Sequence, residues 1–211
     1  MLNVLNQIRM PNKSLQMKYR IRNTLLIFLL GVILGIFSKW LDNLSINDAI
    51  WWQYIIGIMD LGNVFSLFGI WIFIAVTISV FSKTPLRASI NVFVFFVGMS
   101  VSYHLYTIYF SGFNPMSYMM IWYTITLLTP LFAYVCWYAK SEHIISMIIS
   151  GFILCVMFIV SFSIGMWYFD MKSLIDFILF IATVIVLHVR SQNTFYSLII
   201  GLVLAFVIRC I

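Results

Sequence analysis

Charged side chains are scarce in this chain. Only 9% of its 211 residues are Asp, Glu, Lys or Arg, and 64% are hydrophobic, whereas an ordinary soluble domain has about 25% and about 45–50%. A soluble fold of this length exposes a large part of its surface to water, so it could not hide so much apolar area. The composition excludes a water-soluble globular fold and predicts that lipid is the solvent.

Cysteine is also scarce, and the sequence motifs of enzymes are missing. Cys136, Cys155 and Cys210 all lie in apolar segments without a C-x-x-C pair, so neither a zinc site nor a disulfide framework is expected. There is no H-E-x-x-H, no phosphate-binding glycine loop and no G-x-S-x-G. Ser100 and His188 come nearest to a hydrolytic pair, but we expect them at different depths. We therefore expect no catalytic residue, no metal and no cofactor, and an intramembrane enzyme is the third choice of function.

Long apolar runs, in contrast, fill most of the sequence. A helix that crosses a membrane needs about 20 mostly apolar residues, or about 17 at the short end. Seven stretches meet or nearly meet this length: Thr24–Trp40, Val64–Phe81, Ser89–Phe110, Ser117–Ala139, Ile144–Tyr168, Leu174–Val189 and Phe195–Ile211. The last two are the shortest and carry Asp176 and Arg209. The sequence predicts an all-α fold, a polytopic transmembrane helix bundle of six to seven spans over residues 24–211.

Basic residues are unevenly placed along these spans. With the N-terminus inside and the spans alternating, nine basic residues fall inside and three, Lys39, Lys172 and Arg209, fall outside. Because basic loops stay in the cytoplasm, this predicts a cytoplasmic N-terminus. Residues 1–23 then form a basic juxtamembrane segment that lies against the lipid bilayer, and a docking helix for a cytoplasmic partner is the alternative. This placement explains the net charge of +6, so no nucleic-acid partner is expected.

Two shorter features complete the expected topology. The segment from Ala49 to Met59 is too short to cross but begins with Trp51, Trp52 and Tyr54, which is typical of an interfacial helix on the outer surface. Pro130 in the fourth span removes a backbone donor and frees carbonyl groups for another partner. We expect the polar and aromatic residues of a candidate binding site to lie on the outer side of the membrane.

Ionisable residues at membrane depth are costly and are functional candidates by default. His104 lies six residues before the outer end of the third span, and Asp60 and Asp176 are expected at a similar level. Tyr103, Tyr106 and Trp122 surround His104 on the third and fourth spans, so these six residues form the predicted binding site. The alternatives are an aromatic belt at the interface, solvated carboxylates and a neutral, hydrogen-bonded packing histidine. We expect His104 to face the bundle with a polar partner.

Small residues and loop charges give weaker signals. Gly31 and Gly35 form a small-xxx-small pattern in the first span, which favours close packing within the chain or, as the alternative, contact with another membrane subunit. The basic residues expected on the inner face are explained by solvated loops that set the topology, and a contact with anionic lipid or a partner is the alternative.

The region from Lys83 to Lys140 resembles an uncharacterised family of small bacterial multi-pass membrane proteins, in Thr84–Arg87, Gly112–Pro115, Ser117–Tyr118 and Trp137–Lys140. This resemblance implies the bacterial cytoplasmic membrane and no particular activity. The size, the helix count and the first span are similar to substrate-binding subunits of energy-coupling-factor vitamin transporters, by architecture alone. We expect a non-enzymatic small-solute binding or transport component with an outward-facing pocket. The alternative is an accessory or structural protein that acts through helix contacts with a larger complex.

Overall fold

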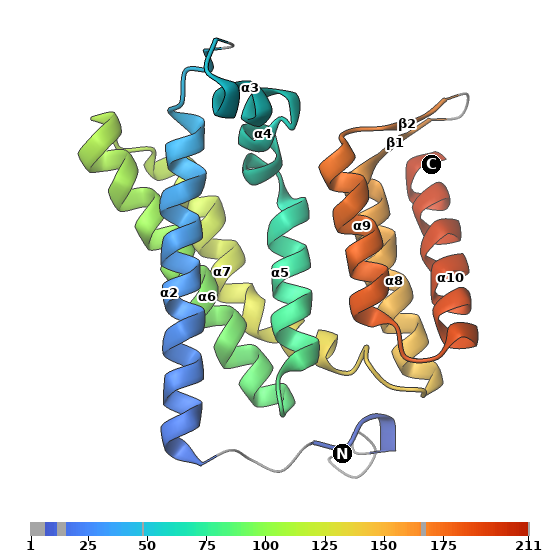
Figure 1. Cartoon of the computed structure of the whole chain (residues 1–211). Coiled ribbons are helices and arrows are strands. Elements are labelled where there is room, and N and C mark those ends of the chain that lie inside the picture. The colour runs from blue at the N-terminus through green and yellow to red at the C-terminus, as the bar shows by residue number, and fades with distance from the viewer. Residues whose placement is uncertain (1–6, 12–15, 48, 166–167, 211) are drawn as a thin grey trace.

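The computed structural model describes residues 7–11, 16–47, 49–165 and 168–210. Upright helices alternate in direction along the chain, and two short helices and a two-stranded hairpin lie at one end (Figure 1). The elements are α2 (Met17–Asp42), α3 (Trp51–Ile58), α4 (Leu61–Ser66), α5 (Phe68–Phe81), α6 (Pro85–Ser111), α7 (Met116–Trp137), α8 (Ile144–Ser161), β1 (Phe162–Ile164), β2 (Phe169–Met171), α9 (Leu174–Leu187) and α10 (Ser191–Cys210). We call the end with the strands the hairpin end and the opposite end the basic end.

Five helices of the described part are long and apolar enough to cross a membrane, namely α2, α6, α7, α8 and α10 up to Arg209. The chain is therefore a multi-pass helical membrane protein, as its composition predicts. Helices α5 and α9 are apolar but have 14 residues each, about 21 Å at 1.5 Å per residue against a hydrocarbon core of about 30 Å. The prediction of six to seven spans requires one or both of these short helices to cross as well.

The predicted span Val64–Phe81 is wrong in its continuity, because the helix breaks at Leu67. This residue has an extended backbone (φ −91°, ψ 163°) and separates α4 from α5. The indole nitrogen of Trp71 donates to the carbonyl oxygen of Phe65 at 2.9 Å, so a polar group freed by the break keeps a partner in a buried setting. Tertiary packing of Trp71 thus stabilises a break that no Gly or Pro announces.

The predicted span Ile144–Tyr168 is too long, because α8 ends at Ser161. The chain then forms an antiparallel hairpin in which Phe162 pairs with Met171 and Ile164 with Phe169. An isolated two-stranded hairpin is marginally stable. Here Phe162 is buried, with its ring centroid 5.0 Å from that of Phe169 and 4.6 Å from that of Phe158. This aromatic cluster favours a strand where hydropathy alone predicted a longer helix.

Helix α3 occupies most of the segment predicted to be interfacial. It ends before Asp60, a non-glycine residue with a left-handed backbone (φ 49°), so it does not continue into α5. Trp51 at its start is exposed. A separate helix is what the interfacial prediction requires, and its position on an outer membrane surface stays a prediction.

The two glycines of α2 lie against α6 of the same chain. A Cβ atom at Gly31 would come closer than 3.0 Å to the carbonyl oxygen of Phe95, and one at Gly35 would approach the carbonyl oxygen of Met99 equally closely. From the other side, Gly98 leaves 2.7 Å between a Cβ atom and the carbonyl oxygen of Phe28. These contacts confirm that Gly31 and Gly35 allow close packing of helices within the chain. A second subunit on this face would have to displace α6.

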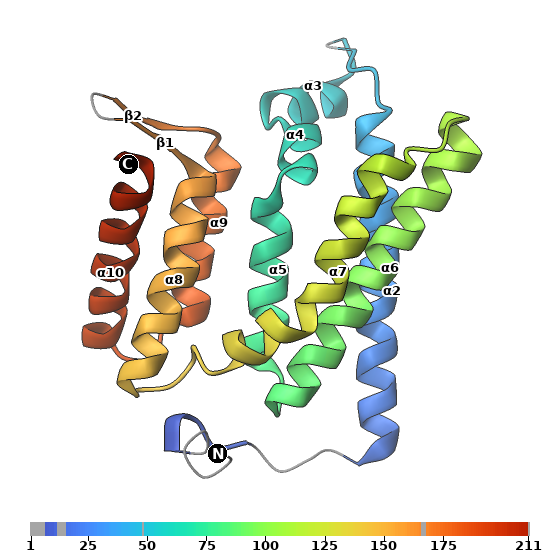
Figure 2. The ribbon, with the colours of Figure 1, turned by 180° about the vertical axis from the view of Figure 1, so that it is seen from behind.

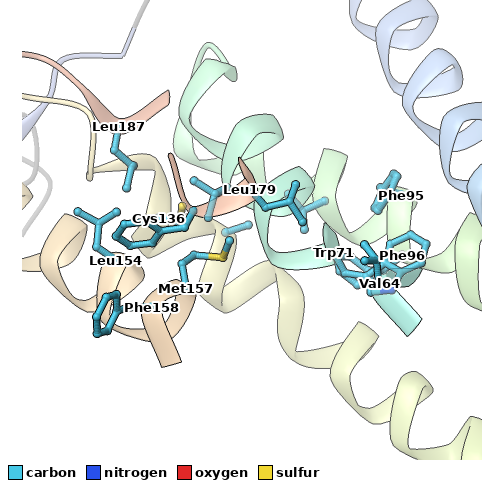
Figure 3. Close-up of a cluster of buried hydrophobic side chains, with 14 of the residues drawn as sticks. Val64, Trp71, Phe95, Phe96, Cys136, Leu154, Met157, Phe158, Leu179 and Leu187 are labelled. Carbon is cyan, nitrogen blue, oxygen red and sulfur yellow. The ribbon is translucent and has the colours of Figure 1, made fainter. Parts of the chain in front are cut away.

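Helix α5 stands between two groups of helices, α2, α6 and α7 on one side and α8, α9 and α10 on the other (Figures 1 and 2). Figure 3 shows buried side chains of both groups and of α4 and α5. On one side of the view are Val64, Trp71, Phe95 and Phe96, and on the other are Leu154, Met157, Phe158 and Leu187. Helices α7 and α8 diverge from their connection at the basic end, as Figure 2 shows. This divergence positions the larger of the two cavities described below.

Candidate functional site

Local sequence signals fix the ends of the α6–α7 pair, which carries most of the predicted site. Thr84 caps α6 by accepting the backbone N–H of Arg87 at 3.2 Å, with Pro85 in the first turn. The helix ends at Gly112, whose left-handed backbone (φ 73°) suits glycine. The turn that follows brings α7 back antiparallel to α6 (Figure 2), and the ring centroid of Tyr103 on α6 lies 6.2 Å from that of Tyr118 on α7.

Asp42 gathers the polar groups at the hairpin end. Its Oδ2 accepts the Tyr103 hydroxyl at 2.7 Å and lies 3.8 Å from Nζ of Lys39, while its Oδ1 accepts the Ser66 hydroxyl at 3.1 Å. The carboxylate thereby joins α2, α4 and α6. Sequence reasoning missed this role of Asp42. The Lys39 and Asp42 pair, three residues apart at a helix end, was the one available signal for this role.

A small cavity lies beside Asp42. Tyr103, Trp122, Trp71 and Ser38 contribute to its wall. Its volume is about 10 Å³, which is close to the minimum for one water molecule. Two of the predicted site residues, Tyr103 and Trp122, therefore share a cavity, but in this conformation it does not admit a solute larger than water.

His104 faces its own helix pair and has both ring nitrogens engaged. Nδ1 lies 2.6 Å from the hydroxyl of Tyr123 on α7, and Nε2 lies 2.8 Å from Oδ1 of Asn114 in the turn. The expected polar partner on the fourth span is therefore Tyr123. His104 is absent from the wall of the cavity beside Asp42, which favours the interpretation of a satisfied packing histidine.

Replacing His104 tests that interpretation. In His104→Phe the ring is kept, but Tyr123 and Asn114 each lose a hydrogen bond, so we expect the free energy of unfolding to fall by about 1–2 kcal/mol. Thermal unfolding of the purified protein in detergent measures this loss. Tyr109→Phe is the control, because Tyr109 is 77% exposed on the same helix. An unchanged midpoint for His104→Phe, together with loss of ligand binding, would make His104 a site residue after all.

The other predicted residues are dispersed. Tyr106 stacks on Phe110, with ring centroids 4.6 Å apart, and contributes to neither cavity. Asp60 is exposed between α3 and α4, where its Oδ2 accepts the Asn63 side chain at 3.1 Å. The common level expected for His104, Asp60 and Asp176 therefore does not produce one cavity.

Asp176 is buried in the first turn of α9. Ser173 caps this helix by accepting the Asp176 backbone N–H at 3.0 Å, and its hydroxyl donates to Oδ2 of Asp176 at 3.0 Å. Oδ1 of Asp176 has no hydrogen-bond partner and faces Gly69 at the start of α5. The solvated alternative for Asp176 is wrong, because only 2% of the residue is exposed.

A much larger cavity opens sideways between α7 and α8, and we call it the lateral cavity. Its volume is about 740 Å³, with walls from α5, α6, α7 and α8, within the range of about 300–1,000 Å³ typical of ligand sites. It extends from Phe68 and Trp122 down to Ser79 and Cys136. Sequence reasoning missed it, since its lining residues look like any other apolar helix faces.

The two hydroxyl groups in the wall of the lateral cavity are satisfied within their own helices. The hydroxyl of Ser79 donates to the carbonyl oxygen of Ala75 at 2.7 Å. The hydroxyl of Thr129 donates to the carbonyl oxygen of Thr126, also at 2.7 Å. The latter carbonyl is the one that Pro130 deprives of its helical donor, so the expected freed carbonyl is satisfied within α7. At its mouth Phe132 is 65% exposed. An apolar cavity of this kind suits hydrocarbon and disfavours water.

Metal chemistry finds no support in the described part of the chain, where no group of three or more His, Cys, Asp or Glu side chains is placed to hold a metal ion. The arrangement offers a carboxylate cluster around Asp42 and an apolar cavity open to the side. The apolar cavity has the shape and hydrophobicity to bind an apolar partner.

Comparisons with known proteins assign no family to this chain. The resemblances drawn from the sequence stay predictions. Neither a protein-family model, nor a curated protein, nor a solved structure matches the chain.

Proposed function

We propose that this chain is a non-enzymatic membrane component that holds an apolar molecule from the bilayer, such as a lipid acyl chain, in its lateral cavity. The observation that carries the proposal is the cavity of about 740 Å³ with an almost wholly apolar wall. A membrane-facing opening beside Phe132 and Phe152, both more than half exposed, gives bilayer lipid direct access. Dispersion and shape, rather than polar recognition, supply the affinity.

Photo-crosslinking tests this proposal. A phospholipid with a photoreactive acyl chain is added to the purified protein, and the labelled peptides are identified by mass spectrometry. We expect label on residues 125–136 of α7 and 149–156 of α8. In Ile153→Trp the larger side chain fills part of the cavity. If it displaces about two methylene groups at about 0.8 kcal/mol each, labelling at subsaturating lipid falls about tenfold.

The control makes the same change on the outer surface of the bundle. Ile33 is 62% exposed on α2 and is not part of the cavity wall, so Ile33→Trp should leave the labelling of α7 and α8 unchanged. Equal thermal midpoints for the two variants show that folding is intact. Label spread evenly over all lipid-facing helices, with no effect of Ile153→Trp, would refute the proposal.

The outward-facing pocket for a small solute is the second candidate. One observation favours it, because Tyr103 and Trp122 line a cavity beside the Asp42 carboxylate. This function requires that cavity to widen beyond about 10 Å³, through movement of α3 and α4. Solute uptake that depends on Tyr103 and is unaffected by Ile153→Trp would favour this candidate over lipid binding.

A further inference from the structure

Arg9 lies at the basic end of the lateral cavity. Its guanidinium donates to the carbonyl oxygen of Trp137 and, from Nη2 at 2.9 Å, to that of Val80. It also lies over the Trp137 ring, 4.2 Å from the centroid. The residues just before these carbonyls, Cys136 and Ser79, line the cavity. A cation is thus placed where the apolar wall ends.

The docking of the N-terminal segment holds Arg9 there. Ile8 is buried against Ala88, Trp137 and Tyr138, and its carbonyl oxygen accepts the Ser141 hydroxyl at 2.6 Å. Ile8 and Arg9 therefore pack on the bundle of their own chain, across the C-terminal ends of α5 and α7. Arg9 is also favoured at this place by the partial negative charge of those helix ends.

Lys140 adds a second cation. Its Nζ donates to the carbonyl oxygen of Val186 at 2.6 Å and lies 4.5 Å from the centroid of the Phe81 ring. Burial, followed by the positive charge of Arg9, lowers the pKa of the Lys140 ammonium group. The hydrogen bonds of Arg9 and Lys140 go to backbone carbonyls and not to carboxylates. Both side chains are only partly buried and keep N–H donors for a further partner.

The charged side chains at the basic end are nearly all positive. Of the described residues near it, Glu142 is the one acid, and the basic residues are Arg9, Lys18, Arg20, Arg22, Lys83, Arg87, Lys140 and Arg190. An anionic group placed between Arg9 and Lys140 would offset their mutual repulsion and gain charge-assisted hydrogen bonds. Among membrane lipids, the charge complement is an anionic headgroup.

We propose that the lateral cavity takes an acyl chain of an anionic phospholipid whose headgroup phosphate pairs with Arg9 and Lys140. This inference rests on the proposed lipid-binding function and adds the class of headgroup. The chain occupies the apolar space from Cys136 toward Trp122, and the phosphate lies at the basic end. With the N-terminus in the cytoplasm, the lipid comes from the inner leaflet, which is rich in anionic lipid.

Native mass spectrometry with competing lipids tests the headgroup. The full chain is mixed with equal amounts of a phosphatidylglycerol and a phosphatidylcholine that have identical acyl chains, and the bound fractions are compared. We expect the wild type to prefer phosphatidylglycerol. The double variant Arg9→Gln, Lys140→Gln should lower that preference about tenfold, equal to about 1.4 kcal/mol. Binding of phosphatidylcholine should weaken less, because its choline cation already neutralises its phosphate.

Two controls keep the outcome interpretable. Arg22→Gln makes the same change at the same end on α2, where Arg22 lies 5.0 Å from the ring centroid of Tyr19, and should retain the preference. Arg9→Lys keeps the positive charge and should retain most of the preference for phosphatidylglycerol. This variant keeps the test usable if removal of the charge harms folding. Equal binding of the two lipids to the wild type, or an equal loss in Arg22→Gln, overturns the headgroup inference and leaves the proposed function standing. Binding of neither lipid overturns both.

Discussion

Gly31→Ala and Gly35→Ala should each lower the free energy of unfolding by about 2 kcal/mol or more, although Ala is the better helix former by about 1 kcal/mol. The new methyl group would come closer than 3.0 Å to the backbone carbonyl oxygen of Phe95 or Met99 on α6. A carbonyl of a helix cannot rotate away as a side chain can, so α2 and α6 must separate and lose dispersion contacts. Thermal unfolding in detergent measures the loss.

Gly62→Ala is the matched control for these variants. Gly62 is also helical, in α4, but a Cβ atom there meets nothing within 4 Å. Because only helix propensity changes, we expect this variant to be neutral or stabilised by at most about 1 kcal/mol. If Gly31→Ala and Gly35→Ala behave like Gly62→Ala, α2 does not pack on α6 as described, and a second subunit becomes a candidate for this face.

Cysteine accessibility should give an all-or-none difference between the two ends of the bundle. In intact cells an impermeant thiol reagent should label Asp170→Cys, at the hairpin end, and should label Lys83→Cys only after permeabilisation. The reason is the excess of basic residues at the basic end, which keeps that end in the cytoplasm. Both positions are exposed on the protein surface, so local burial does not determine the result.

A Cys210→Ser chain is the background for this labelling, since the other two cysteines, Cys136 and Cys155, are buried. Labelling of Lys83→Cys in intact cells, with Asp170→Cys protected, would reverse the orientation. The anionic lipid would then have to come from the outer leaflet. Labelling of both positions from outside would require a chain that does not alternate across the membrane between α5 and β2.

The sequence alone determined the class of protein and most helix positions. Its scarcity of charge requires lipid as the solvent, and apolar runs near 20 residues must form helices because backbone groups in hydrocarbon need partners within the same segment. Local chemistry also set several helix ends, as at Thr84 and Gly112. The small-xxx-small pair Gly31 and Gly35 predicted close helix packing, although it did not name α6 as the partner.

The tertiary structure alone decided where the chain departs from regular spans and where it leaves space. A hydrogen bond from Trp71 stabilises the break at Leu67, and contacts of the Phe162 ring with Phe158 and Phe169 stabilise the hairpin after Ser161. Tyr103 and Asp42, 61 positions apart, pair through helix packing, and the lateral cavity exists because α7 and α8 diverge. Hydropathy predicts whether a segment lies in lipid or in water. It does not predict which side chains contact one another in the folded chain, and these features follow from those contacts.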